Sequence, residues 1–230
     1  MEKQLSFRVE SQNCVQRLIP DLQIEGRQFI PTCGPGLVVA NHYTRAGLPA
    51  WWFVLAISSQ LPVDIHWVIT AAWTFPGRPY AQTLEQVSRW ALTKIARCYG
   101  FSTMPPMPPK PGETLARAKA VRQVLSYIQN YPNSIIGIAP EGKDNPGGIL
   151  GWPEPGTGRF LLHLAAHGMP LIPVAVYESE GVLTVNFGSA YQLAVPAGLT
   201  NQRRDSQASR VVMQSIARLM PVRMRGVIEG

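Results

Sequence analysis

Charged residues are scarce in this 230-residue chain: they make up 15% of it, whereas hydrophobic residues make up 46%. This composition excludes a disordered chain, which would combine low hydrophobicity with high charge. Long apolar runs are also missing, since the longest, over residues 48–57, is about half of what a membrane-spanning helix needs. The N-terminus MEKQLSFRVE lacks an apolar stretch as well. We therefore expect neither a signal peptide nor a transmembrane helix.

Cysteine is rare, and the signatures of several common chemistries are missing. Cys14, Cys33 and Cys98 show no metal-ligand or CxxC spacing, which favours reduced thiols in the cytoplasm. No P-loop, dinucleotide fingerprint or Gly-x-Ser-x-Gly elbow occurs, which argues against nucleotide binding and a serine hydrolase. His163 and His167 have the spacing of two metal ligands on a helix, but no third ligand is apparent nearby, so we expect no metal.

Acidic residues are outnumbered, 14 against 21 Lys and Arg, which gives a net charge of +7. This balance favours an anionic partner, such as a membrane surface, an acidic carrier protein, a phosphate-bearing substrate or nucleic acid. Six of the arginines lie within residues 200–230. That segment has no zinc-knuckle, RRM-like or helix-turn-helix signature, so we expect a membrane surface or carrier protein and no nucleic acid.

Strand and helix patterns alternate along the chain. Short apolar segments predict strands over residues 37–41, 64–71, 134–139, 171–177 and 182–187. Helical patterns cover residues 49–58, 83–98, 113–129, 158–166 and 207–219. The alternation predicts a single layered α/β domain, in which helices cover a mostly parallel sheet. Residues 1–30 form an N-terminal lead-in segment in this interpretation, and residues 31–230 form the domain.

Two of the helices carry specific expectations. The segment PAWWFVLAIS, residues 49–58, is apolar on all sides and is therefore either buried or in contact with lipid. In the helix over residues 113–129, we expect Leu115, Ala118, Leu125 and Ile128 to form the packed face. Residues 100–111 contain MPPMPPKP, which cannot be a helix or an inner strand and is read as a connecting loop or a lid.

Two predicted strands end in residues suited to chemistry. Asn41 and His42 follow the first strand, and Glu141 follows the strand over residues 134–139. The carboxyl ends of parallel strands are where open α/β sheets place their sites. Histidine is the side chain best suited to move a proton near neutral pH. His42 is therefore the first candidate for catalysis, the alternative being a histidine that holds a loop.

Three short blocks in register resemble the glycerolipid acyltransferases, the family that includes the bacterial lysophosphatidate acyltransferases. The blocks are Asn41-His42, Pro140-Glu141-Gly142 and Pro170-Leu171-Ile172-Pro173-Val174. The resemblance implies a glycerol-3-phosphate acyltransferase-like fold and a role in phospholipid biosynthesis. It implies acyl transfer to a lipid or small-molecule acceptor from acyl-CoA or acyl carrier protein as co-substrate, with no other cofactor. His42 would be the general base.

The resemblance also suggests where substrates bind. Asn41, Glu141, Gly142 and Lys143 would contact the acceptor, together with Arg45 and Asp144. The apolar segment over residues 49–57 and the loop over residues 100–111 would receive the acyl chain. Together with the positive charge, this predicts a cytoplasmic protein that associates peripherally with an anionic membrane surface.

The sequence departs from the family at two positions. Gly47 stands where the family has the aspartate that orients the histidine, and Lys143-Asp144-Asn145 replaces the common Thr-Arg-Ser. Another carboxylate such as Asp144, or a backbone carbonyl, would have to hold the ring. Otherwise the chain is a weak or inactive homologue that binds acyl lipid or carrier protein. A thioesterase-like hydrolase is a further alternative. Since lysine does not grip phosphate bidentately, a neutral, amine-bearing or differently placed anionic acceptor fits better than lysophosphatidate.

Overall fold

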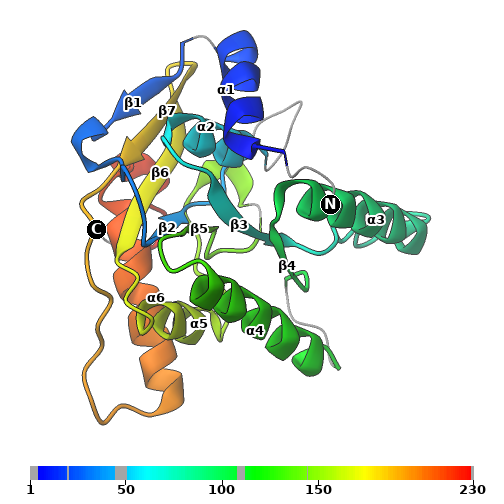
Figure 1. The fold of residues 1–230 in the computed structure, drawn as a ribbon, viewed down its shortest axis with the longest axis vertical. Helices are drawn as coiled ribbons and strands as arrows, with labels where there is room; N and C mark the ends of the chain where they lie inside the picture. The colour runs from blue at the N-terminus through cyan, green and yellow to red at the C-terminus, as the bar shows by residue number, and fades with distance from the viewer. Residues whose placement is uncertain (1–4, 20, 45–50, 108–111, 144, 229–230) are drawn as a thin grey trace.

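The structure, a computed structural model, describes residues 5–19, 21–44, 51–107, 112–143 and 145–228. Within these residues seven strands form one sheet in the order β1-β7-β6-β2-β5-β3-β4. Paired strands run parallel except β6 and β7, which are antiparallel. Helices pack against the sheet on both faces (Figure 1). The fold is the mostly parallel α/β layer that the alternation of patterns predicts.

The strands match the predicted segments and add two short ones at the sheet edges. Their bounds are β1 Gln23–Glu25, β2 Gly36–Ala40, β3 Ile65–Thr70, β4 Ser102–Met104, β5 Ile135–Ile138, β6 Leu171–Ser179 and β7 Val182–Phe187. Strand β2 lies at the centre and is buried at every position. Its side chains alternate between the two hydrophobic cores, with Val38 in one core and Leu37 and Val39 in the other.

The described part of the chain contains six α-helices. They are α1 Phe7–Leu18, α2 Trp51–Gln60, α3 Ala81–Tyr99, α4 Thr114–Asn130, α5 Thr157–Ala165 and α6 Asn201–Ala217. Helices α1 and α2 pack on one face, and α4, α5 and α6 pack on the other. Short 3₁₀ helices occupy Arg27–Phe29, Pro146–Gly148 and Val222–Met224. No helix in the described residues is both long and apolar enough to cross a bilayer.

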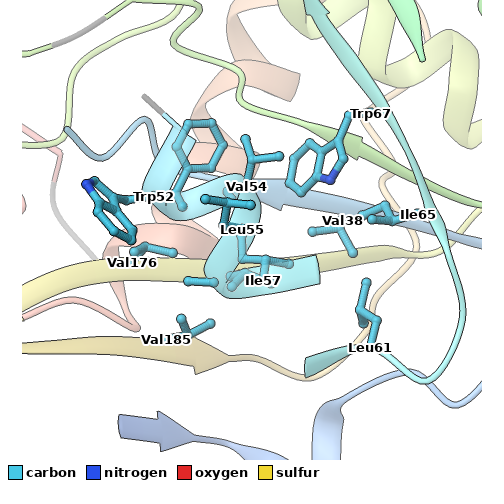
Figure 2. Close-up of a cluster of buried hydrophobic side chains, with 14 of the residues drawn as sticks. Val38, Trp52, Val54, Leu55, Ile57, Leu61, Ile65, Trp67, Val176 and Val185 are labelled. Carbon is cyan, nitrogen blue, oxygen red and sulfur yellow. The ribbon is translucent and has the colours of Figure 1, made fainter. Parts of the chain in front are cut away.

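Helix α2 is a core helix. Its residues from Trp52 to Ser59 are all buried, and its side chains pack on Val38, Val176 and Val185 of the sheet (Figure 2). Helix α1 lies over its other side. Of the two alternatives for this segment, burial is confirmed for the described part of the helix and the lipid-facing one is wrong, because the sheet and α1 cover most of its apolar surface.

The described part of the predicted lead-in belongs to the layered domain. Strand β1 pairs in parallel with β7, and α1 packs on α2. The start of α1 is tied to the carboxylate of Asp64, which accepts hydrogen bonds from the Ser6 hydroxyl and the Arg8 backbone N–H. Phe7, Val15 and Ile19 thus belong to the same core as α2 and the sheet.

Two loop and helix expectations change in detail. The packed face of α4 is formed by Ala120, Val124 and Ile128, whereas Leu115, expected on that face, is 81% exposed. The error arises because Leu115 lies in the first turn, where the helix extends past the sheet it covers. In the Pro-rich segment over residues 100–111, β4 pairs with β3 at the sheet edge. An edge strand tolerates the prolines that follow it.

His66 of β3 is a buried structural histidine. Its ring stacks on Tyr127 of α4 with 3.6 Å between ring centroids, and its Nε2 lies 2.9 Å from the Ser102 hydroxyl oxygen. Burial lowers the pKa of His66 to about 4. The folded protein therefore holds this ring uncharged at pH values where the unfolded chain would protonate it.

We predict that His66 makes the protein less stable as the pH falls from about 6.5 toward 4. In that window the unfolded chain binds a proton that the folded chain does not, which costs about 2 kcal/mol of unfolding free energy at pH 5. When the pH is lowered from 8 to 5, the free energy of unfolding of the uncharged variant His66→Gln should therefore rise by about 2 kcal/mol relative to that of wild type. Urea unfolding of both proteins at the two pH values measures it. A constant difference between them would contradict the prediction.

Candidate functional site

The ends of β2 and β5 meet at the carboxyl edge of the sheet. The two strands are parallel neighbours with Val39 opposite Ile138, and continuing this register places His42 opposite Glu141. The sequence predicts both residues at strand ends, and the strand order brings those ends together. The candidate site therefore lies at the carboxyl ends of the central strands β6, β2, β5 and β3.

Asn41 fixes the end of β2 to β6. Its side-chain nitrogen donates to the Val176 carbonyl at 2.8 Å, and its oxygen accepts from the Val176 N–H at 2.7 Å. The side chain is 1% exposed. Both polar atoms of the amide thus extend the ladder between the two strands, which gives Asn41 a positioning role. Beside it, the hydroxyl of the buried Tyr43 donates to Glu178 of β6 at 2.7 Å.

Glu141 is a buried carboxylate that joins three segments. One oxygen accepts from the His42 backbone N–H at 2.6 Å, and the other accepts from the Gly151 N–H at 2.8 Å and from the Asn145 side chain. The residue is 1% exposed. Burial raises the pKa of Glu141, while the hydrogen bonds and the charge of the His42 ring oppose that shift. The carboxylate therefore holds the backbone of His42 and orders the loop after β5.

The ring of His42 lies at the wall of an apolar cavity. It is partly exposed, and its centroid is 5.1 Å from that of the Phe53 ring of α2. The cavity has a volume of about 560 Å³, within the usual range for small-molecule sites. Its walls come mainly from apolar side chains of α2, β3, the loop after β3 and α3: Trp51, Phe53, Val54, Trp67, Val68, Ile69, Ala72, Trp73, Phe75 and Leu92.

Trp67 forms part of the cavity wall because Gly137 makes room for it. Gly137 of β5 pairs with Trp67 of β3, and a Cβ at Gly137 would lie 2.5 Å from the indole ring. No larger residue fits there without moving the ring. The missing side chain at Gly137 thus fixes the position of the Trp67 indole, which is among the largest fully buried side chains.

A second cavity of about 230 Å³ lies on the other side of the sheet edge. It is lined by Arg117 and Val121 of α4 and by Phe160 of α5. The two cavities share six lining residues from β3, the loop after β4 and the end of β5: Val68, Ile69, Thr70, Met107, Ala139 and Gly142. They are therefore two parts of one cleft that crosses the carboxyl edge of the sheet.

Met107 stands where the two cavities meet. The Arg117 guanidinium donates to the Met107 sulfur at 3.3 Å and to the Pro106 carbonyl, and it pairs with Glu113 at 3.1 Å. Gly142 lies against Met107, since a Cβ there would be 2.9 Å from the Met107 Cγ. The side chain is thus held between α4 and the turn after β5.

Of the other predicted site residues, Gly142 and Lys143 line the first cavity. The Lys143 ammonium lies 2.7 Å from the Glu154 carboxylate, so its charge is already paired. Arg45, Gly47 and Asp144 lie outside the described residues. The described residues contain no group of three His, Cys, Asp or Glu side chains arranged to hold a metal ion. His163 and His167 contact each other instead, through a hydrogen bond between the His167 ring and the His163 carbonyl.

Sequence reasoning missed several residues of the site. Asn145 binds Glu141, Phe53 lies beside the His42 ring, and Met107 divides the cleft. The apolar pattern of residues 49–58 signals burial and does not say which side chain faces His42. For Met107, the only sequence signal is its place in a Pro-rich segment that follows an edge strand.

Comparisons with known proteins agree with this arrangement. The family model described as Acyltransferase matches residues 21–177, a range that includes His42, Glu141 and the block from Pro170 to Val174. No curated protein sequence matches the chain. The fold is similar to the crystal structure of the 1-acyl-sn-glycerophosphate (LPA) acyltransferase PlsC from Thermotoga maritima. The TM-score is 0.53, with 17% identity, 92% of this chain and 79% of that chain covered.

We predict that Glu141→Gln destabilises the protein by about 1–3 kcal/mol. An amide has one oxygen, so its NH₂ group must face the N–H of either His42 or Gly151 and leave that buried donor unsatisfied. Urea unfolding measures the effect. Glu154→Gln is the matched control, because it weakens a partly exposed ion pair worth about 0–1 kcal/mol. Equal effects of the two substitutions would contradict the role given to Glu141.

Proposed function

This chain belongs to the acyltransferase family, and from that membership we propose that it transfers a fatty acyl group from acyl-CoA or acyl carrier protein to a lipid or small-molecule acceptor. The observation that carries the proposal is the position of His42. Its backbone is fixed by a buried carboxylate, and its ring faces an apolar cavity of a size suited to a ligand. The acyl thioester and the acceptor would meet at this ring.

The chemistry needs one proton to move. The His42 imidazole takes the proton of the acceptor hydroxyl as the oxygen attacks the thioester carbonyl. The carbon–sulfur bond then breaks, and the imidazolium returns the proton to the leaving thiolate. No covalent bond to the protein is required. The other residues of the proposed site act by positioning His42 or by binding a substrate.

Glu141 compensates in part for Gly47, the residue at the family's aspartate position. Its carboxylate accepts a hydrogen bond from the His42 backbone N–H, and its negative charge attracts the His42 ring once that ring is protonated. A carboxylate near the ring stabilises the imidazolium that forms during the reaction. Asn41 keeps the strand end in register through Val176. We propose that both are positioning residues, while Gly142 and Lys143 border the acceptor. Contacts of the acceptor with Arg45 and Asp144 stay predictions.

The acceptor is proposed to lack a phosphate bound at Lys143. Lys143 is the first residue of the segment that replaces the family's Thr-Arg-Ser, and Asp144 stands at the arginine position. The Lys143 ammonium is paired with Glu154. A phosphate there would have to displace that carboxylate. A neutral or amine-bearing acceptor has no such requirement. The net charge of +7 further supports a protein held at an anionic membrane surface on the cytoplasmic side.

We predict that His42→Ala lowers acyl transfer by a factor of about 10² to 10⁴, the usual contribution of a general base. The measurement is mass spectrometry of lipids from bacteria that express wild type or variant, followed by a purified assay with acyl-CoA. The purified assay offers lysophosphatidate, a monoacylglycerol and a long-chain amine as acceptors. His163→Ala, at an exposed histidine, is the control and should keep wild-type activity.

The outcomes of this experiment separate the alternatives. An acceptor-dependent product that is lost in His42→Ala supports transfer. Free fatty acid formed without an acceptor indicates a thioesterase-like hydrolase. Tight acyl binding without either product indicates a homologue that binds and does not turn over. A clear preference for lysophosphatidate among the acceptors would contradict the proposal about Lys143.

We predict that Met107→Ala extends the range of accepted acyl chains. In the wild type, each methylene added to the donor should improve binding about fourfold until the first cavity is filled. Removing the Met107 side chain opens that cavity to the second, so the improvement should continue to longer chains. A donor series of increasing chain length measures it. Met104→Ala, which enlarges only the second cavity, should keep the wild-type limit.

A further inference from the structure

Helix α3 lies at one side of the molecule and is packed along only part of its surface. It extends away from the sheet at the right of Figure 1, with its C-terminal end against β4. Only one narrow face of α3 is packed, through the buried side chains of Ser88, Leu92 and Ala96. Near its C-terminal end, Ile95 and Tyr99 also pack on the core, and Tyr99 contacts Phe7 of α1. The first three turns present an exposed outer side.

That surface is apolar along one flank. Leu84, Val87 and Trp90 follow each other at intervals of three residues on one side of α3, and they are 39%, 58% and 61% exposed. Tyr80, directly before the helix, is 82% exposed and adds another large exposed side chain at the start of α3. Large apolar side chains that remain in water over consecutive turns mark an interaction surface.

The chemistry of this flank points to a lipid surface. Two of its side chains are Trp and Tyr, whose amphipathic rings prefer the membrane–water interface. Around them, four cations, Arg78, Arg89, Lys94 and Arg97, accompany a single carboxylate, Glu85. Glu85 is paired with Arg89 at 3.1 Å. The Lys94 ammonium lies 4.2 Å from the centre of the Trp90 ring, so apolar and cationic groups share one face.

Helix α3 also borders the cavity that has His42 in its wall. Trp73, 41% exposed, lines that cavity, and its backbone N–H donates to the Ser88 hydroxyl of α3. Leu92, on the packed face of α3, lines the same cavity. A surface that docks on lipid through α3 would therefore place the cavity at the lipid itself.

We propose that the outer flank of α3, with Tyr80 and Trp73, is the docking surface for a membrane that contains anionic headgroups. The inference rests on the proposed function, because it gives a lipid substrate a direct route to His42. This docking surface differs from the two segments that the sequence alone assigns to lipid or membrane contact, residues 49–57 and residues 200–230. The apolar helix α2 is buried, and the basic residues of 200–230 are not needed for the apolar contact.

Docking is tested by sedimentation with vesicles of phosphatidylglycerol and phosphatidylcholine, compared with vesicles of phosphatidylcholine alone. Wild type should bind the anionic vesicles and bind more weakly as salt increases. The double variant Val87→Glu/Trp90→Glu should bind at least tenfold more weakly. Both positions are exposed, so circular dichroism and the thermal midpoint should match wild type. Leu115→Glu, at an apolar residue on α4 that is even more exposed, is the control and should bind like wild type.

A second assay separates this inference from the proposed function. With a short-chain soluble donor and acceptor and no vesicles, the double variant should keep wild-type turnover. If wild type shows no turnover there, the proposed function fails, while vesicle binding still reports on α3. The inference is overturned by wild type that ignores anionic vesicles, by a double variant that binds normally, or by equal loss in Leu115→Glu. Self-association that the double variant abolishes, without vesicle binding, would assign the flank to a second copy instead.

Discussion

The candidate site depends on one buried carboxylate. Glu141, at the end of β5, accepts hydrogen bonds from the His42 backbone at the end of β2 and from Gly151 and Asn145 in the loop between β5 and α5. Separately, each of these segments is a short, glycine-rich or polar piece of chain with little apolar area to bury. A carboxylate in a nearly water-free place makes strong, directional contacts with all three. Burial raises the pKa of Glu141, and the hydrogen bonds from the same donors oppose that rise.

The cleft follows from the order of the strands. The chain crosses from β2 to β3 on one side and returns to β5 between them, while β6 continues on the other side. Helices α2 and α3 then border the edge on one face, and α4 and α5 border it on the opposite face. Their ends diverge over the carboxyl edge, where the cleft forms. His42 stands on the side with the larger part of the cleft.

Much of this arrangement is visible in the sequence, for a physical reason. Buried parallel strands are apolar along their whole length, so the five longer strands stand out, and adjacent parallel strands must bring His42 and Glu141 to one edge. The remainder depends on contacts between distant segments. Strand β1 has three residues and exists because β7 pairs with it. The helical period could not fix the packed face of α4, where Leu115 is exposed and Val124 is buried. Nor could the Asn41-His42 pair reveal that the amide of Asn41 serves Val176.

Gly137 and Trp67 form a matched pair across two strands, and their match has an evolutionary consequence. The shape of the cavity is set partly by a residue that never touches it, because the glycine determines how deep the indole ring sits. Among relatives of this chain, the two positions should therefore vary together: a side chain at 137 requires a smaller residue at 67. Such an exchange would reshape the substrate cavity while the buried volume of the sheet stays constant, so that specificity could drift without loss of stability.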